Sequence, residues 1–449
     1  MPKVPAPFAS MKKGFDYGQA VAEAHRCLLC HDAPCSKGCP GGTDPGTFIR
    51  KLRFQNLTGA VRTIKQNNIL GGSCGELCPT PLLCEKECSA AGLDRPIQIG
   101  KIQRFLVEHA WATGFNPLEK GPARKEKIAI VGSGPAGLSC AAELARAGFG
   151  VTVFEARAKA GGVLRYGVPS YRFSPDFIDR ELKDVTSLGV KFQCNRPVRG
   201  KGAVEALLKK GFSAVFLAPG CWEPLRLKVK AKVRKGLLAW TEFLTPLKEG
   251  KFAALGKQIK GRRVAVIGGG SVAMDCAESA IKLGARDVYM VYRRSYNEMP
   301  AEEDEKLAAL RMGMHLLMLN QPVDYSTDSQ GRLKAVVLVR TELGTPDPSG
   351  RRKPVEVAGS EWELPVDLVV EAIGAQPARD AIEWSRSMKL SDGHLITVNP
   401  DTGQTSVKRI FAGGDIVRGP ALIIEAVRDG KITAKSIVER FAKKENAHE

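Results

Sequence analysis

Cysteine is concentrated in one short stretch of this 449-residue chain, and that stretch limits what the chain can fold into. Eight of the 12 cysteines fall in two sets within the first 90 residues, and each set includes a Cys-Pro step. Thiolates separated by two to four residues can converge on one inorganic core, because a tight turn aims several sulfurs at it. The spacing therefore predicts two [4Fe–4S] clusters. The sets are Cys27, Cys30, Cys35 and Cys39, then Cys74, Cys78, Cys84 and Cys88.

Two other interpretations of these cysteines are a zinc ribbon and reduced structural thiols. Zinc sites favour Cys-x2-Cys pairs a dozen or more residues apart, often with histidine, and the spacing here is denser. A disulfide framework is disfavoured, because the first thirty residues contain no apolar signal segment and we expect a cytoplasmic, reducing location. The other four cysteines are expected to be ordinary buried residues: Cys140, Cys194, Cys221 and Cys276.

Length and charge exclude several classes of protein. At about 150 residues per domain the chain has room for about three domains, and no apolar run reaches the ~18 residues of a spanning helix, so we expect no membrane insertion. The net charge of +19 raises the alternative of a basic zinc protein that binds nucleic acid. Lys and Arg are spread along the chain, however, and no motif for reading RNA or DNA is present, so we expect no nucleic-acid partner.

A glycine-rich turn marks the first dinucleotide site. It follows a short apolar strand at residues 128–131 and opens a helix, so its glycines would permit a tight turn and let the backbone approach a pyrophosphate at the helix N-terminus. A second strand at 151–154 ends at Glu155, which is placed to accept hydrogen bonds from a ribose. The predicted contacts in the turn are Gly132, Gly134, Pro135, Ala136 and Gly137.

A second turn of the same kind follows a strand at 264–267. The next strand, at 288–292, ends in Arg293 and Arg294 instead of an acid, which favours the 2′-phosphate of NADPH, with NADH as the other possibility. The alternative is that these arginines are solvated or pair with Asp287 and Glu298. The predicted contacts in the turn are Gly268, Gly270, Ser271, Val272 and Ala273.

Two dinucleotide folds in one chain imply hydride transfer between two cofactors. A strand at 410–412 leads to Gly414 and Asp415 before a helix at 421–427, which is where flavoproteins with two such folds return to the flavin. We therefore predict an α/β chain with a helical iron–sulfur domain at 1–120 and two Rossmann-like domains. The FAD domain is split into 121–250 and 366–449 by an inserted NAD(P)H domain at 251–365. In the first domain, helical periodicity is expected at 16–27 and 47–67.

With these residues in view, the chain resembles the electron-input module of dihydropyrimidine dehydrogenase, within the glutamate synthase small-subunit superfamily. The likeness runs nearly end to end, and the cysteine segment is closest to the separate flavin subunit of the bacterial two-subunit enzyme. The segments that carry it are residues 26–35, 43–46, 77–80, 99–105, 161–169 and 371–374.

The resemblance implies interleaved cluster ligands. One cluster would be held by Cys27, Cys30, Cys35 and Cys88, and the other by Cys39, Cys78, Cys84 and the amide oxygen of Gln103. Cys74 would then be a bystander, although its spacing alone suits a ligand. The resemblance also implies cofactor contacts at Gly162, Leu164, Arg286, Arg293, Arg294 and Gly374.

Two departures from the family pattern matter. Residues 218–220 read Ala-Pro-Gly where many relatives have Ala-Thr-Gly near the flavin. The bacterial pyrimidine subunit is usually associated with NADH, whereas Arg293 and Arg294 resemble the NADPH-using branches. Because of these two arginines, we expect NADPH.

The expected activity is hydride transfer from NADPH to FAD, followed by single-electron transfer through two clusters to a partner subunit. That partner would be a flavin mononucleotide barrel that reduces the 5,6 bond of uracil or thymine, which makes a hetero-oligomer. No side chain is expected to act as general acid or base, and the single Cys276 in the second glycine segment excludes a dithiol mechanism. The alternatives within the superfamily are a glutamate synthase small subunit and a ferredoxin:NADP oxidoreductase subunit, which would use a ferredoxin-like carrier.

Overall fold

The computed structural model describes residues 6–8, 14–347, 350–384 and 388–445. The chain divides into two compact units, each described by itself. The smaller unit is Met1–Ala9, Tyr166–Tyr171 and Trp222–Ala375, and the larger unit is Ser10–Arg165, Arg172–Cys221 and Gln376–Glu449.

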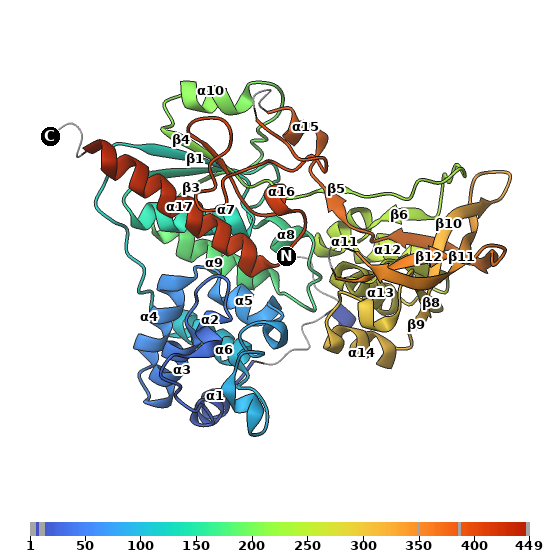
Figure 1. Cartoon of the computed structure of the whole chain (residues 1–449), viewed down its shortest axis with the longest axis horizontal. Helices are drawn as coiled ribbons and strands as arrows, with labels where there is room; N and C mark the ends of the chain where they lie inside the picture. The colour runs from blue at the N-terminus through green and yellow to red at the C-terminus, as the bar shows by residue number, and fades with distance from the viewer. Residues whose placement is uncertain (1–5, 9–13, 348–349, 385–387, 446–449) are drawn as a thin grey trace. The chain divides into compact units, whose positions relative to one another are not determined.

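The larger unit begins with a helical module, drawn in blue in Figure 1. The periodicity at 47–67 predicts one helix, but the structure has two, because Gln55 adopts a left-handed backbone (φ 58°) and Asn56 caps a new helix by accepting from Gly59 N at 2.8 Å. Phe48, Leu52 and Ile64 form the core of the module. Its helices are α1 (Tyr17–His25), α2 (Pro34–Lys37), α3 (Pro45–Arg53), α4 (Leu57–Asn67), α5 (Gly71–Leu77) and α6 (Ile99–Thr113), with 3-10 turns η2 (Thr80–Leu82) and η3 (Ser89–Gly92).

A parallel sheet forms the rest of the larger unit. Its order is β16-β4-β1-β2-β3, so a strand from the C-terminal part of the chain completes a sheet begun by the first glycine motif. This confirms the split dinucleotide fold. The strands are β1 (Lys127–Val131), β2 (Gly150–Phe154), β3 (Lys191–Gln193), β4 (Ala214–Leu217) and β16 (Ile410–Ala412). The helices are α7 (Pro135–Arg146), α8 (Gly162–Tyr166), α9 (Pro175–Ser187), α10 (Ala203–Lys209), α15 (Arg379–Ile382), α16 (Asp415–Arg418) and α17 (Ile423–Glu445).

The smaller unit contains a second parallel sheet, ordered β6-β14-β7-β8-β9, and an antiparallel sheet. Because β6 (Leu237–Ala239) and β14 (Leu368–Glu371) pair in the parallel sheet, this unit begins before and ends after the 251–365 predicted from its glycine motif. The other strands are β5 (Glu223–Pro224), β7 (Arg263–Ile267), β8 (Asp287–Tyr292), β9 (His315–Met318), β10 (Asn320–Thr327), β11 (Leu333–Pro346), β12 (Arg352–Glu356), β13 (Trp362–Pro365) and β15 (Ala375–Gln376). The helices are α11 (Trp240–Lys248), α12 (Phe252–Ile259), α13 (Ser271–Lys282) and α14 (Glu303–Arg311), with 3-10 turns η1 (Ala6–Phe8) and η4 (Tyr296–Glu298).

Among the described residues, no helix combines the length and the apolar character needed to cross a membrane.

Buried polar contacts join the helical module to α9 of the same unit. Lys65 donates to Asp184 at 2.6 Å, and the Trp111 indole N–H donates to the same carboxylate at 3.0 Å. Nearby, Glu181 accepts from the Ser73 backbone N–H at 2.8 Å and from the Ser73 hydroxyl. Burial raises the pKa of Glu181 to about 8, so this carboxyl keeps a proton in the folded chain at neutral pH.

We expect Glu181→Gln to change how stability depends on pH. A folded-state pKa above the unfolded value adds stability below the unfolded pKa, and that stability is lost as pH rises through the folded pKa. The wild-type free energy of unfolding should therefore decline between about pH 4.5 and pH 8 through this group, and the Gln variant should decline less. Anaerobic urea unfolding across this pH range measures both. Equal slopes for the two proteins would contradict the assignment.

Candidate functional site

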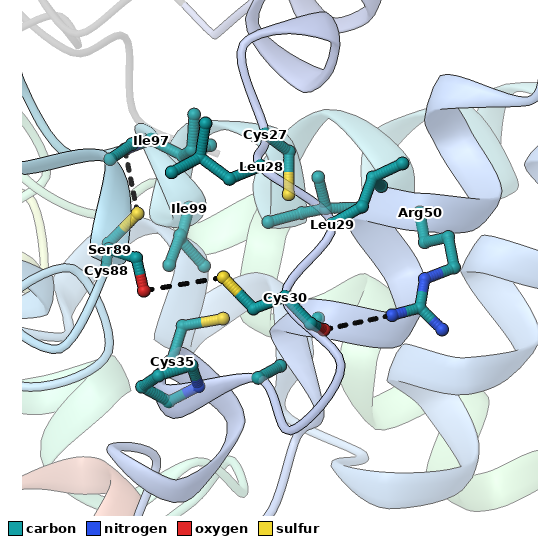
Figure 2. Close-up of a pocket in the computed structure, with 15 residues that line it drawn as sticks. Cys27, Leu28, Leu29, Cys30, Cys35, Arg50, Cys88, Ser89, Ile97 and Ile99 are labelled. Carbon is teal, nitrogen blue, oxygen red and sulfur yellow. Dashed lines mark hydrogen bonds between the residues drawn. The ribbon is translucent and has the colours of Figure 1, made fainter. Parts of the chain in front are cut away.

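Four cysteines from separate segments line one cavity in the helical module. Cys27, Cys30 and Cys35 come from the first set and Cys88 from the second, and their thiols face a common space (Figure 2). The remaining walls are largely apolar and include Leu28, Leu29, Ile49, Ile97 and Ile99. The structure thus brings together the four residues that the family resemblance assigns to one cluster.

The backbone of this loop is held from α3. Leu29 adopts a left-handed conformation (φ 55°), which turns the chain between Cys27 and Cys30. Arg53 donates to the carbonyl of Cys27 at 2.6 Å, and Arg50 donates to the carbonyl of Cys30 at 3.1 Å. Both arginines therefore hold the loop in the conformation that points its thiols into the cavity.

The electrostatics of the cavity suit a cationic group among the thiols. Burial raises the pKa of Cys35 to about 11, and the neighbouring cysteines add to the shift. The pKa of Cys27 is also raised, mainly by burial. Positive charge between the sulfurs would reverse this effect and stabilise thiolates, as iron does. The Ile97 N–H already points at Cys88 Sγ at 3.5 Å, which is the kind of contact that tunes an iron–sulfur cluster.

The thiols surround a space instead of meeting at one point. In the part of the chain that the structure describes, no three His, Cys, Asp or Glu side chains are gathered as ligands of a single metal ion. In a [4Fe–4S] cluster each thiolate binds a different iron, so the ligands stand around the core. The arrangement of Cys27, Cys30, Cys35 and Cys88 fits such a cluster.

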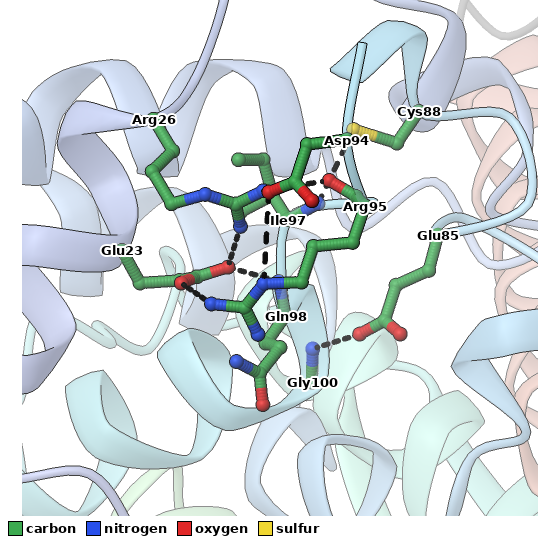
Figure 3. A network of polar contacts seen from close by, with 9 residues as sticks. All are labelled: Glu23, Arg26, Glu85, Cys88, Asp94, Arg95, Ile97, Gln98 and Gly100. Carbon is green, nitrogen blue, oxygen red and sulfur yellow. Dashed lines mark hydrogen bonds and ion pairs between the residues drawn. The ribbon is translucent and has the colours of Figure 1, made fainter. Parts of the chain in front are cut away.

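A polar network holds the segment that follows Cys88 (Figure 3). The buried carboxylate of Glu23 receives Arg26 Nη1 at 2.6 Å, Arg95 Nη2 at 3.5 Å and the Gln98 backbone N–H at 2.9 Å. This network fixes the stretch that presents the Ile97 N–H to Cys88. Sequence reasoning missed Glu23, because a lone acid on a helix gives no signal of its burial.

The second predicted ligand set is distributed over the loop after α2, the end of α5 and the turns after it, and α6. Burial raises the pKa of the Cys84 thiol, and the charges of Glu85 and Cys39 add to the shift, so Cys39 lies near Cys84. Gln103 is buried, and its Nε2 donates to the carbonyl of Gly71 at 2.5 Å, which leaves its Oε1 as the atom suited to a ligand role. Cys78 ends α5, and its N–H donates to the carbonyl of Cys74 at 3.0 Å.

Cys74, predicted to be a bystander, is also near this set. It is buried, receives Asn68 Nδ2 at 3.3 Å, and has a pKa raised chiefly by burial and partly by the charge of Cys39. Its engagement by an amide in the protein interior is the arrangement of a structural thiol.

The first glycine motif forms the turn between β1 and α7. Gly132 has φ 100°, and a Cβ there would overlap with the carbonyl of Ala218. A Cβ on Gly137 would overlap with the carbonyl of Gly132, so α7 packs tightly on the strand. A Cβ on Gly134, in contrast, would meet no atom within 4 Å. Gly134 therefore faces open space at the start of α7, where a pyrophosphate would lie. Pro135 and Ala136 begin the helix.

Glu155 organises the loops around this turn. Its carboxylate accepts from the Ser133 N–H at 3.2 Å, from the Ser133 hydroxyl, and from the Arg157 N–H at 2.8 Å. The Ser133 hydroxyl in turn accepts from Gly161 N at 2.9 Å. Gly162, with φ 53°, lies against Gly134. Leu164 is fully buried behind it.

The C-terminal glycine–aspartate segment lies at the same end of this sheet. Gly414 has φ 76°, donates its N–H to Asp429 at 2.8 Å, and lies beside Ala136 of α7. Burial raises the pKa of Asp415 to about 6. Asp415 begins a short helix, α16, and the helix predicted at 421–427 is the start of the longer α17. The two motifs predicted to share the flavin are therefore brought together.

The second glycine motif repeats the geometry in the smaller unit. Gly268 has φ 139°, and a Cβ there would overlap with the carbonyl of Ala372. A Cβ on Gly270 would come no closer than 3.7 Å to another atom, which again leaves room at a helix N-terminus. Ser271, Val272 and Ala273 form the first turn of α13, with Val272 39% exposed. Gly374 lies in this unit, with φ 120° and its carbonyl accepting from Leu225 N.

The three arginines near the second motif have different surroundings. Arg286 pairs with Asp287 at 3.0 Å, and Arg294 is buried and pairs with Asp347 at 2.7 Å. Arg293 is exposed, and its side chain makes no ion pair within the described residues. Its pKa is lowered by burial of part of the guanidinium and by the charges of Arg294 and Arg351. Positive charge therefore gathers at the end of β8, where a 2′-phosphate would meet Arg293.

Two family models match this chain. Residues 5–115 match "Dihydropyrimidine dehydrogenase domain II, 4Fe-4S cluster", and residues 126–430 match "Pyridine nucleotide-disulphide oxidoreductase". The first match covers the helical module with its cysteines. The second covers both parallel sheets and the C-terminal return.

Two curated relatives are similar along almost their whole length. The "Glutamate synthase [NADPH] small chain" of Escherichia coli (strain K12) is 33% identical over 444 residues, which cover 96% of this chain and 93% of the relative. The "NAD-dependent dihydropyrimidine dehydrogenase subunit PreT" of the same organism is 34% identical over 421 residues, which cover 93% of each chain.

Among solved structures, "Mycobacterium tuberculosis FprA in complex with NADPH" matches with a TM-score of 0.60 and 21% identity, covering 72% of this chain and 86% of that one. At this identity the likeness concerns the fold alone, and it confirms the pair of dinucleotide-binding folds.

Proposed function

We propose that this chain is the electron-input subunit of a pyrimidine-reducing enzyme. The chain belongs to the pyridine nucleotide-disulphide oxidoreductase family, and it carries an iron–sulfur domain of the dihydropyrimidine dehydrogenase type. The chain is an NAD(P)H-dependent flavin and iron–sulfur oxidoreductase. In our proposal it takes hydride from NADPH onto FAD and delivers single electrons, through two [4Fe–4S] clusters, to a cytoplasmic partner that reduces the 5,6 bond of uracil or thymine.

The cysteine-lined cavity carries this proposal. Cys27, Cys30, Cys35 and Cys88 face one space although 53 positions separate the third from the fourth (88 − 35). An arrangement this specific supports an electron-transfer role for the helical module, next to a fold suited to FAD. Bound FAD would convert a two-electron donor into a source of single electrons. The chain's own residues position the cofactors and exclude water, and none is assigned as general acid or base.

Anaerobic titration with NADPH tests the input side. We expect the flavin absorbance to bleach first and the broad absorbance of the clusters to fall afterwards. Absence of flavin bleaching, or an equal response to NADH at low concentration, would contradict the cofactor assignment.

The terminal acceptor is inferred from the iron–sulfur domain. The match over residues 5–115 is to an iron–sulfur domain named for dihydropyrimidine dehydrogenase, which favours a pyrimidine. The glutamate synthase small chain is nearly as similar in sequence as the pyrimidine subunit, 33% against 34%, and makes glutamate synthase the second candidate. Purification of the native complex distinguishes them: a flavin mononucleotide barrel supports our proposal, and a large amidotransferase or a ferredoxin-like carrier contradicts it.

The choice of nucleotide depends on Arg293. We expect Arg293→Gln to raise the KM for NADPH about 10- to 100-fold, because a hydrogen bond to a charged group contributes roughly 1.5–3 kcal/mol. The KM for NADH should change little. Steady-state reduction of a dye with each nucleotide measures both values. Arg311→Gln, on the surface of the same unit, is the matched control. An equal loss with both nucleotides would show that Arg293 does not recognise the 2′-phosphate.

A further inference from the structure

Lys431 of α17 joins the flavin fold to the loop that contains Cys39, within the larger unit. Its Nζ donates to the carbonyls of Gly41 and Asn67, both at 2.7 Å. Gly41 is two residues after Cys39 in the first cysteine set, and Asn67 ends α4. A flavin-domain helix therefore places an ammonium group against the loop of a predicted cluster ligand.

The charge of Lys431 is satisfied by neutral groups in these contacts. Both acceptors, from Gly41 and Asn67, are carbonyl oxygens, and burial lowers the pKa of Lys431, while the charges of Glu143 and Cys39 act to raise it. Glu143 is shared with Arg146, which lies 3.4 Å away on the same helix. Two cations thus share one carboxylate here, and Lys431 lies near enough to Cys39 for their charges to interact.

The position of Lys431 is set by close helix packing. A Cβ on the preceding residue, Gly430, would overlap with the carbonyl of Ala136. Because Ala136 belongs to the turn of the first glycine motif, α17 can rotate little about its axis at this point. The same contact that brings the helix against the flavin phosphate turn also directs Lys431 to the Cys39 loop.

The loop that contains Cys39 is a tight turn close to the charge of Lys431. Gly42 has φ 64° and donates its N–H to the carbonyl of Cys39 at 3.0 Å, and the Thr43 N–H points at Cys39 Sγ at 3.5 Å. A Cβ on Gly42 would lie 3.7 Å from Lys431 Nζ. The thiol of Cys39 therefore lies in a tight turn that also presents the Gly41 carbonyl to the Lys431 ammonium.

We propose that Lys431 is a positioning residue that holds the Cys39 loop and raises the reduction potential of the cluster bound there. The inference rests on the proposed function, since it requires the second cluster. Reduction adds one negative charge to a cluster, and a nearby cation stabilises that state. Lys431 would make this cluster a better electron acceptor for the flavin whose phosphate turn packs on the same helix.

The test is a redox titration of the intact protein at pH 8.5, followed by electron paramagnetic resonance. We expect Lys431→Gln to lower the midpoint potential of one cluster so that its reduction becomes about tenfold less favourable, or about 59 mV for one electron. Lys431→Arg should retain the wild-type potential, because it keeps the charge. Reduction of the flavin by NADPH should be unaffected by either change.

Arg146→Gln is the matched control. Arg146 carries the same charge and donates to the carbonyl of Gln66, next to the second acceptor of Lys431. A potential that shifts equally in both Gln variants, or in neither, would overturn the inference.

A second variant covers the case in which Lys431→Gln loses iron. Glu143→Gln removes the carboxylate and leaves both cations, so it should raise the same potential, and an unchanged potential would overturn the inference. The iron content of the wild type separates this result from failure of the proposed function. About four irons per chain would refute the second cluster, whereas about eight with unshifted potentials would refute only the role of Lys431.

Discussion

Replacing Cys88 with alanine should remove one cluster and leave the other in place. Cys88 lies in the second cysteine set by sequence but lines the cavity with Cys27, Cys30 and Cys35. Loss of one thiolate ligand would open that cluster to solvent and oxidation. We expect iron to fall from about eight to about four per chain, and electron transfer to the partner to fall by at least about 100-fold. Reduction of FAD by NADPH should persist. Iron analysis and stopped-flow spectroscopy measure the two effects.

Cys74→Ala separates this assignment from one based on sequence spacing. If the first four cysteines held one cluster and the last four the other, Cys74→Ala would cost as much iron as Cys88→Ala. In the interleaved arrangement, Cys74→Ala keeps both clusters, because Cys74 is a buried thiol held by Asn68. Cys194→Ala, a half-buried cysteine outside both sets, is the control for general effects of cysteine removal. Iron loss in Cys74→Ala would refute the ligand assignment.

Much of the fold follows from local patterns in the sequence. Both glycine motifs follow apolar strands and open helices, so their strands and turns agree with the structure within a residue or two. The return of the chain at β16 was also predictable, because its Gly-Asp ending is a local signal. The break at Gln55 was not, since one left-handed residue between two amphipathic helices leaves the helical periodicity nearly unchanged.

The candidate site was predictable only in part, for a related reason. Cysteine spacing indicates that thiols cluster. It cannot show that Cys88 of the second set lines a cavity with three cysteines of the first set, since that arrangement depends on how α3 and the turns fold together. The Glu23 network and Lys431 are likewise invisible in the sequence, because each includes contacts with backbone groups distant along the chain. Every residue has a backbone N–H or carbonyl, with few exceptions, so the residue type of such a partner gives no signal in the sequence.

The prediction of largest effect on the flavin concerns Gly134. A Cβ there meets nothing in the protein, so Gly134→Val should leave the chain folded, while its side chain would occupy the space predicted for the pyrophosphate. Because each hydrogen bond to a charged group contributes roughly 1.5–3 kcal/mol, losing two such contacts should weaken FAD binding at least about 100-fold. Equilibrium binding of FAD to the apoprotein, with thermal unfolding measured alongside, checks both expectations.

Variants of two other glycines serve as controls, which show whether the effect of Gly134→Val comes from lost contacts with the cofactor. Gly132→Val should lower stability as well as FAD affinity, because φ is 100° at Gly132 and a Cβ would overlap with the Ala218 carbonyl. Gly256→Val, on α12 of the smaller unit, also adds a side chain into open space and should leave FAD binding unchanged. If Gly134→Val bound FAD like the wild type, this turn would not hold the pyrophosphate. The difference between Gly132 and Gly134 follows from their surroundings: one glycine is required by the protein's own backbone, and the other leaves room for a ligand.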